Sequence, residues 1–266
     1  MITSMQNPWV KKISKLRKRR EREISNTFLI EGFRELTRAV SAGVAFEALF
    51  FCKELFLGEN EESLIEKIQQ NAKAIPVEKS IFEKISYRDR PDGLIAIAKT
   101  FSTDLERIEK IIQNKKSPFI LIAESIEKPG NLGTILRSAD AAGVDAVIVA
   151  DPCTDLFNPN VVRASTGMLF SMPVATADNP QLLSFLEKYK IKTIAATPHS
   201  KKNYVDEDMT GPVAILVGTE QYGLSDFWME KSLSSVAIPM KGFADSLNVA
   251  TATTIMLYEV LRQRTQ

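Results

Sequence analysis

The stretch from Ile238 to Glu259 reads IPMKGFADSLNVATATTIMLYE, and the rest of the chain is interpreted outward from it. It begins at the end of an apolar strand and passes through a glycine-containing loop that holds Ser246 and Asn248. It then continues into a helix rich in Ala, Thr, Ile, Met and Leu. Such a loop lets backbone N–H and C=O groups face a ligand, while the following helix anchors it.

Two earlier segments repeat this arrangement of strand, loop and helix. In LVGTEQYGLSD an apolar strand ends at Gly218, and Glu220 lies just past it. In LIAESIEKPGNLGTILRSADAAGV a strand ends at Glu124, a Pro-Gly turn follows, and a helix is predicted to start near Asn131 with Arg137 inside it.

Together these segments contain N-x-G-x-x-x-R from Asn131, G-x-E-x-x-G-L from Gly218 and S-L-N-V from Ser246. One such motif arises easily by chance, but three in order, each at a predicted strand end, form a specific signal. The chain resembles the SpoU (TrmH) family of RNA 2′-O-ribose methyltransferases, in the SPOUT superfamily. The resemblance is good from Ser117 to Arg264 and looser over the first hundred residues.

Composition indicates an ordinary globular protein. The chain has 266 residues, 44% of them hydrophobic and 25% charged, with a net charge of +1. This length suits one large or two modest domains. Cys52 and Cys153 are too few and too far apart for a disulfide framework or a zinc site, which fits a reducing compartment. Without an apolar run of about 18 residues or a signal-peptide pattern, we expect no membrane span and a cytoplasmic location.

Residues 1–24 are predicted to form a basic leader helix. Eight Lys or Arg residues lie between Lys11 and Arg22, and Trp9, Ile13 and Leu16 form a narrow apolar stripe. A basic helix face is often only solvated, but it can also neutralise phosphates. Beside the methyltransferase motifs we favour RNA binding, with these candidate residues: Lys11, Lys12, Arg19 and Arg20.

Residues 25–100 alternate short strands with helices, which predicts a small α/β domain. The family resemblance implies an L30e-like substrate-binding domain here, with FLIEGFREL near its start and DGLIAIA at its end. The family usually has Gln-Gly before the last strand, whereas this chain has Asp92-Gly93. Residues 101–116 are charged and weakly helical, and we interpret them as a linker.

Residues 117–266 are predicted to form an α/β domain with a mostly parallel sheet. Five apolar strands, in FILIAES, DAVIVAD, IKTIAATP, PVAILVGTE and SSVAIPM, alternate with helical stretches that include NPNVVRASTGMLF. The pattern alone indicates an open, doubly wound sheet. The resemblance instead implies a SPOUT-type domain with a deep trefoil knot, in which the last helix is threaded through a loop.

The resemblance implies methyl transfer from S-adenosylmethionine (SAM) to a ribose 2′-hydroxyl, without a metal. Because an arginine stays protonated near neutrality, we favour an electrostatic and phosphate-orienting role for Arg137 over proton abstraction. Asn131 is a candidate helix N-cap that can also face the acceptor ribose. Glu220 can accept hydrogen bonds from Arg137 or Asn131. Ser246 and Asn248 can reach the acceptor.

The resemblance also suggests where the donor and a second subunit bind. Backbone groups in the three loops hold the donor in the family, and the matching positions are Thr197, Gly218, Ile238 and Leu247. Arg163, in the R-A-S-x-G run, is expected to face the site of the second subunit of a homodimer and to contact RNA. The single histidine, His199, is expected in an exposed turn.

Three functions compete. The first is a homodimeric SAM-dependent methyltransferase acting on rRNA, with the large-subunit 23S rRNA as the favoured acceptor and tRNA as an alternative. The second is a non-catalytic protein that binds structured RNA. The third, a dinucleotide-binding oxidoreductase, needs G-x-G-x-x-G, but EKPGNLGTIL offers only G-x-x-G. We favour the first because all five candidate catalytic residues occur together: Asn131, Arg137, Glu220, Ser246 and Asn248.

Overall fold

The computed structural model describes residues 1–265 and divides them into two compact units. The N-terminal unit comprises Met1–Phe101 and also Asp155–Ser171. The C-terminal unit comprises Ser102–Thr154 and the chain from Met172 onward. Residues 155–171, predicted to belong to the C-terminal domain, are part of the N-terminal unit.

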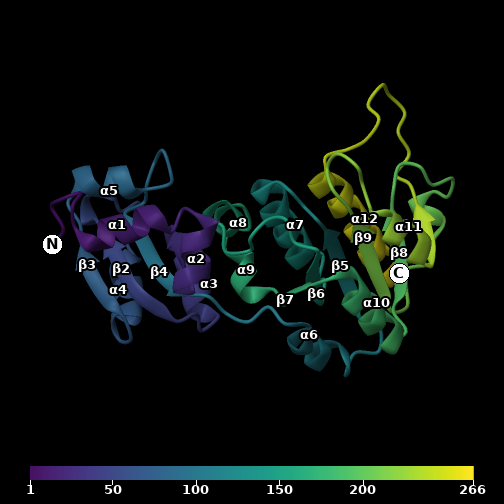
Figure 1. Ribbon diagram of the computed structural model, residues 1–266, viewed down its shortest axis with the longest axis horizontal. Helices are drawn as coiled ribbons and strands as arrows, with labels where there is room; N and C mark the ends of the chain where they lie inside the picture. Colours follow the sequence, from purple (N-terminus) through teal and green to yellow (C-terminus); the bar gives the residue numbers. More distant parts are fainter. Residues whose placement is uncertain (266) are drawn as a thin grey trace. The chain divides into compact units, whose positions relative to one another are not determined.

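The N-terminal unit is built on a four-stranded sheet with the order β1-β4-β2-β3 (Figure 1). β2 and β3 are parallel and the other pairs are antiparallel. The predicted alternation of strands and helices is confirmed. The strands are β1 (Thr27–Glu31), β2 (Phe46–Phe51), β3 (Lys73–Pro76) and β4 (Leu94–Lys99). The helices are α1 (Pro8–Lys15), α2 (Arg19–Ser25), α3 (Phe33–Ser41), α4 (Glu61–Gln69) and α5 (Lys79–Ile85), with a short 3-10 turn η1 (Lys53–Leu55).

The basic leader is two helices, and it is part of the N-terminal core. Val10, Ile13 and Leu16 are buried in one cluster with residues of the sheet and α5. The chain breaks after α1, and this break brings the buried Arg22 back to donate a hydrogen bond to the Leu16 carbonyl at 2.8 Å. Arg22 also forms an ion pair with Asp155 at 2.7 Å. The break therefore satisfies a carbonyl that the end of α1 leaves free.

Residues 155–171 form two short helices, α8 (Pro159–Ala164) and α9 (Met168–Ser171), rather than one helical stretch. Thr166 and Gly167 between them have φ values of 51° and 84°. A Cβ on Gly167 would lie 3.2 Å from the Cα of Glu35 in α3, so this turn packs closely on that helix. Arg38 of α3 donates to the Thr166 hydroxyl at 2.9 Å. The turn between α8 and α9 thus lets residues 155–171 pack closely against α3.

The C-terminal unit is an α/β fold around a six-stranded sheet in which every pair is parallel, with the order β10-β8-β9-β5-β6-β7. The five predicted strands are confirmed, and a sixth strand, β7, was not predicted because it is only four residues long. The strands are β5 (Phe119–Glu124), β6 (Ala146–Ala150), β7 (Val174–Ala177), β8 (Lys192–Ala196), β9 (Val213–Val217) and β10 (Ser234–Val236).

Helices cover both faces of this sheet (Figure 1). Buried residues of α6, α10 and α11 share one core cluster with alternate residues of the strands. On the other side α7 and α12 pack against each other, and α12 contacts β9. The helices and the 3-10 turn of this unit are α6 (Leu105–Ile112), α7 (Pro129–Ala141), α10 (Asn179–Lys188), η2 (Tyr204–Asp206), α11 (Asp226–Lys231) and α12 (Val249–Arg264). Every helix within residues 1–265 is too short or too polar to traverse a lipid bilayer.

A buried ion-pair cluster around Glu207 gives a prediction about acid stability. Lys192 Nζ lies 2.5 Å and Lys202 Nζ 3.1 Å from the Glu207 carboxylate, which also accepts a hydrogen bond from Ser234 Oγ. Burial opposes ionisation, but hydrogen bonds from Lys192, Ser234 and Lys202 outweigh it and lower the pKa of Glu207 from 4.5 to about 2. The ionised group therefore stabilises the fold above pH 4.5, and this contribution is lost as the pH falls toward 2.

We expect Glu207→Gln to lower the free energy of unfolding at pH 7 by about 3 kcal/mol at most. Between pH 4.5 and 2 its stability should fall less than that of the wild type. Urea denaturation across this range measures both effects. Glu187→Gln, at an exposed position of α10, is the control and should retain the pH dependence of the wild type. Equal pH dependence in Glu207→Gln and the wild type would contradict the prediction.

Candidate functional site

The three sequence motifs meet through hydrogen bonds between side chains in the C-terminal unit. Asn131 Nδ2 donates to Glu220 Oε1 at 2.7 Å. Asn248 Nδ2 donates to Asn131 Oδ1 at 3.2 Å. Asn131 is in the first turn of α7, Glu220 follows β9, and Asn248 immediately precedes α12. Because β5 and β9 are adjacent and parallel, the loops at their carboxyl ends lie at the same edge of the sheet.

Glu220 is on a tight loop whose shape depends on two glycines. Thr219 N–H donates to the Gly223 carbonyl at 2.8 Å, and Gly223 N–H donates back to the Thr219 carbonyl at 3.1 Å. Gly223 has a φ of 73°, a conformation that favours glycine. A Cβ on Gly218 would lie 2.1 Å from the carbonyl of Gly223. The loop therefore requires glycine at position 218 for reasons of packing alone.

The Glu220 carboxylate also holds the chain that leads into α7. It accepts hydrogen bonds from the backbone N–H groups of Glu127 and Lys128, each at 3.2 Å. Burial alone would raise its pKa, but the hydrogen bond from Asn131 and several from backbone N–H groups lower it below 4.5. Glu220 is thus ionised at neutral pH and acts as an acceptor that joins two loops.

Asn131 does not cap its helix, so that part of the sequence prediction is wrong. α7 begins at Pro129, and its N-cap residue is Lys128. Proline suits the first helical position because it lacks the N–H that the helix cannot satisfy there. The Asn131 side chain is therefore free to bond Glu220 and Asn248. Asn248 itself is an N-cap, since its Oδ1 accepts from Ala250 N–H at 3.0 Å at the start of α12.

Arg137 is exposed on α7, and its side chain forms no hydrogen bond or ion pair with any of residues 1–265. Of the two partners expected for Glu220, only Asn131 makes the contact. Arg137 lies six residues after Asn131, which is about 9 Å further along the helix and roughly 120° around it. The position of α7 next to α12 is held by a hydrogen bond between Ser138 Oγ and Thr254 Oγ1, which are 2.7 Å apart.

Ser246 is not brought into the hydrogen-bonded cluster. It is exposed in the loop between β10 and α12, and among residues 1–265 its side chain has no hydrogen-bond partner. Figure 1 shows this loop, in the yellow-olive part of the colour scale, extending away from the sheet of the C-terminal unit. Only its last residue, Asn248, contacts the cluster.

The candidate donor-binding positions all follow the carboxyl ends of β8, β9 and β10. Within residues 1–265, the backbone N–H and C=O groups of Gly218, Ile238 and Leu247 take part in no hydrogen bond. They are therefore available to a ligand at this edge. Thr197 is buried, and its N–H already donates to the Val236 carbonyl at 3.0 Å. His199 is exposed in the turn that follows, as expected.

Comparison with known proteins identifies the family of this chain. The sequence profile described as the SpoU rRNA Methylase family matches residues 118–258, which is more than half of the chain. The chain belongs to the SpoU family. A second profile, the MRM3-like substrate binding domain, matches residues 7–96.

Three methyltransferases resemble almost the whole chain. A 23S rRNA (uridine(2479)-2′-O)-methyltransferase of Streptomyces viridochromogenes is 32% identical over 92% of this chain and 86% of its own length. A solved structure described as an RNA 2′-O ribose methyltransferase is 38% identical and superposes with a TM-score of 0.84, covering 100% of this chain and 99% of that one. An AdoMet-bound rRNA methyltransferase of Sinorhizobium meliloti is 29% identical with a TM-score of 0.88, covering 98% and 97%.

One polar network beside the candidate site was not predicted from the sequence, where Glu124 was recognised only as a strand end. The buried Glu124 carboxylate accepts hydrogen bonds from Ser225 Oγ at 2.6 Å and from Ser225 N–H at 2.8 Å. Asn179 donates to the same carboxylate at 2.8 Å and accepts from Trp228 Nε1 at 2.7 Å. The network fixes the chain after the Glu220 loop. A carboxylate inside an apolar strand run is the signal that could have found it.

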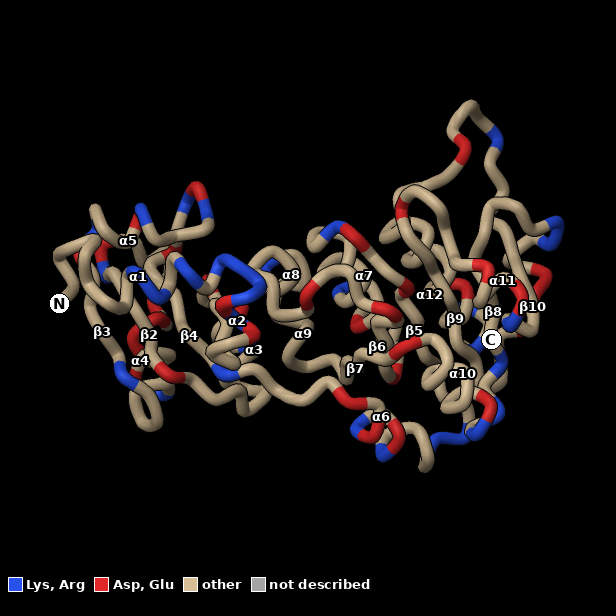
Figure 2. Tube along the Cα trace, in the orientation of Figure 1, with Lys and Arg blue, Asp and Glu red and all other residues tan. Residues whose placement is uncertain are grey.

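The basic residues predicted to bind RNA differ in their surroundings. Lys11 and Arg20 are exposed, whereas Lys12 pairs with Glu47 at 2.6 Å and Arg19 with Glu23 at 2.7 Å. Figure 2 shows Lys and Arg in blue along α1 and the connection to α2.

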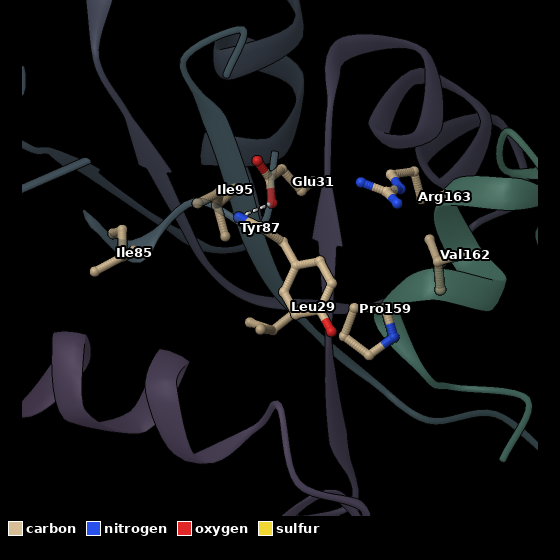
Figure 3. A pocket seen from close by; sticks show the side chains of 8 residues that line it. All are labelled: Leu29, Glu31, Ile85, Tyr87, Ile95, Pro159, Val162 and Arg163. Atoms are coloured by element: carbon tan, nitrogen blue, oxygen red, sulfur yellow. Dashed lines mark hydrogen bonds between the residues drawn. The ribbon is translucent and has the colours of Figure 1, made fainter. Parts of the chain in front are cut away.

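Arg163, on α8, lines a cavity within the N-terminal unit (Figure 3). Figure 3 shows its guanidinium group facing Glu31 across this space, with Leu29 and Pro159 among the apolar lining residues. The cavity volume is about 20 Å³, room for about one water molecule. Burial raises the pKa of Glu31.

Proposed function

We propose that this chain is a SAM-dependent methyltransferase that methylates a ribose 2′-hydroxyl in 23S rRNA. The observation that carries the proposal is the joining of the three family motifs by Asn131, Glu220 and Asn248 beside the unpaired backbone groups of three loops. The relatives named above, whose descriptions specify 2′-O-methylation of RNA or bound AdoMet, support it.

The residues present fit a SAM molecule at the carboxyl edge of the sheet. Backbone groups of Gly218, Ile238 and Leu247, which are unpaired within residues 1–265, would hold it there. Thr197, at the end of β8, is a weaker candidate because its backbone N–H and C=O are already paired. When bound, SAM supplies a methyl group that is already activated by the sulfonium sulfur. In the overall reaction the bond from this methyl group to sulfur breaks, a bond to the ribose O2′ forms, and the hydroxyl proton leaves to solvent. A metal is not required for this transfer.

The protein side chains then have orienting and electrostatic roles. Asn131 and Asn248 are fixed by hydrogen bonds, so they can place the acceptor ribose with little loss of conformational freedom. An arginine stays protonated near neutrality, and the Arg137 side chain has no partner among the described residues, so it is available to bind a phosphate or to stabilise the charge that develops on O2′. Ser246 is exposed in the loop that ends at Asn248, where its hydroxyl is a candidate contact to the acceptor.

Several finer features belong to the same proposal. The C-terminal unit contains the trefoil knot of SPOUT proteins, and the N-terminal unit is an L30e-like substrate-binding domain. The protein is a homodimer in the cytoplasm, where ribosomal RNA is found, and Arg163 contacts RNA. The profile match of residues 7–96 to a substrate binding domain supports a role of the N-terminal unit in RNA recognition.

The proposal is tested by transfer of tritiated methyl groups from SAM to total rRNA and to total tRNA. Nuclease mapping then identifies the labelled nucleotide. We expect label in a 2′-O-methyl nucleotide of 23S rRNA. Label only in tRNA would change the acceptor class. No label in either pool, with SAM binding intact by calorimetry, would contradict the proposed enzyme and favour a non-catalytic RNA-binding protein.

We define the basic groove as the space between α1 and α2 that is lined by Lys11, Lys12, Lys15 and Glu21. We expect this groove to contribute to RNA affinity by binding phosphates. Its volume is about 330 Å³. Lys11 and Lys15 are exposed and form no ion pair within residues 1–265. They are therefore free to displace counterions from phosphates, unlike Lys12.

We expect Lys11→Ala/Lys15→Ala to reduce the slope of log affinity against log salt by about 1.4 to 1.8, because each phosphate contact contributes about 0.7 to 0.9. The control is Lys67→Ala/Lys73→Ala, which removes two exposed lysines from α4 and β3. Filter binding to rRNA at several salt concentrations measures the slopes. Equal slopes for both double variants would show that the groove does not bind phosphate. Deleting residues 1–24 is unsuitable, because it removes part of the core.

A further inference from the structure

Two aromatic side chains near the candidate site have no partner within residues 1–265. Tyr222 is 78% exposed and Phe243 is 108% exposed. The other aromatic side chains among the large exposed ones, Tyr87 and Tyr258, are 37% and 47% exposed. Tyr222 is in the same loop as Glu220, and Phe243 is in the loop that ends at Asn248. Each loop that contributes a polar residue to the cluster therefore also presents one aromatic ring to solvent.

The backbone at Tyr222 is held in place. Its N–H donates to Thr219 Oγ1 at 2.9 Å, within the loop closed by the two hydrogen bonds between Thr219 and Gly223. Tyr222 is two residues from Glu220, so its Cα lies within about 7 Å of that residue. Since Glu220 bonds Asn131, the position of the ring is coupled to that of the site.

Phe243 is on the loop that leads to Asn248. It is five residues before Asn248, so their Cα atoms are at most about 17 Å apart. Its loop leaves the same edge of the parallel sheet as the Glu220 loop. Lys241 and Asp245 on either side of Phe243 are exposed and charged. The two rings therefore project from a polar, charged surface around the cluster.

We propose that Tyr222 and Phe243 stack on unpaired RNA bases at the acceptor nucleotide and its neighbours. The inference rests on the proposed function. A ribose whose base is stacked in a helix is poorly accessible, and proteins hold unstacked bases on aromatic side chains. Such stacking tolerates any base because every base has a π-face. Tyr222 and Phe243 are thus positioning residues that hold the RNA strand while Asn131 and Asn248 orient the ribose.

Two other occupants fit these rings less well. The donor is expected against the unpaired backbone of Gly218, Ile238 and Leu247, all of which are less exposed than the tips of the loops where the rings lie. A second copy of the chain would favour a continuous apolar patch, because charged residues are depleted from the centres of protein interfaces. The charged residues beside Phe243 instead suit a nucleic acid.

The test measures kcat, the KM for rRNA and the SAM dissociation constant of Tyr222→Ala and Phe243→Ala. We expect each to raise the KM about tenfold while kcat and SAM affinity stay within twofold. Tyr222→Phe and Phe243→Tyr retain the ring and should restore the wild-type KM. Leu233→Ala removes a 74% exposed apolar side chain at the other edge of the sheet and should have no effect.

The possible contrary results are distinct. An unchanged KM, or a loss that the ring-retaining variants do not restore, overturns the inference. Weaker SAM binding would assign the rings to the donor, and a halved mass by analytical ultracentrifugation would assign them to a subunit interface. Either result also overturns it. If the wild-type protein labels no RNA, the proposed function fails instead, and this outcome is recognised before any variant is made.

Discussion

Arg137→Ala is expected to reduce methyl transfer to RNA by about 10³-fold, the scale seen when a preorganised electrostatic group is removed. The side chain is exposed and has no partner among residues 1–265, so the melting temperature should stay within roughly 2 °C of the wild type. SAM affinity should stay within a few-fold, because the proposed donor contacts lie on other loops. Single-turnover transfer, calorimetry and thermal denaturation measure the three quantities.

Two further variants test whether a loss of activity in Arg137→Ala is specific to this position and to the guanidinium group. Arg107→Ala removes another exposed arginine of the same unit, on α6, which covers the face of the sheet opposite α7, and it should leave transfer unchanged. Arg137→Lys keeps the charge but loses the planar fork that binds phosphate at two points, so intermediate activity is expected. Near wild-type transfer by Arg137→Ala would remove Arg137 from the site.

Gly218→Ala is expected to lower the free energy of unfolding by roughly 2–4 kcal/mol and to reduce activity strongly. The added Cβ would lie 2.1 Å from the Gly223 carbonyl and 2.3 Å from Leu224 N, which are backbone atoms that cannot rotate away. The Glu220 loop must therefore move, and the 2.7 Å hydrogen bond to Asn131 cannot survive that movement unchanged.

Gly211→Ala provides the matched control for this substitution. Its Cβ would meet no atom within 4 Å, so we expect stability within about 0.5 kcal/mol of the wild type and full activity. Urea denaturation and methyl transfer assays test both variants. If Gly218→Ala is as stable and active as Gly211→Ala, the close packing of Gly218 against Gly223 does not maintain the site.

Local patterns were sufficient to predict most elements of the fold. Apolar runs such as FILIAE became strands that are buried along their whole length, because the sheet is covered on both faces. β7 escaped prediction because its four residues, VATA, do not form a long apolar run. The break between α8 and α9 escaped because it depends on packing of Gly167 against α3, a contact distant in sequence.

The candidate site was predictable as a set of residues but not as a set of contacts. Sequence analysis named Asn131, Glu220 and Asn248, and the structure joins them. Arg137 was also predicted as a partner of Glu220, but the two side chains are not in contact, because Arg137 lies further along α7 and on another side of the helix than Asn131. The roles of these residues in catalysis stay predictions until the variants are measured.

In the basic leader, too, the sequence predicted the residues but not their contacts. Its charges and apolar stripe are visible in sequence, but Arg22 is a buried structural residue and Lys11 is not. This difference depends on Asp155, which lies more than a hundred residues away in the chain.

The sequence by itself determined the strand and helix alternation, the three motifs and thereby the SpoU family. These features follow from local residue order, since apolar periodicity and turn residues act over a few positions. Only the tertiary structure decided which polar groups meet, which cations are already paired, and which unit holds residues 155–171. Such contacts depend on strand order and helix rotation, because a hydrogen bond requires its two atoms within about 3.5 Å, however far apart they lie in the chain.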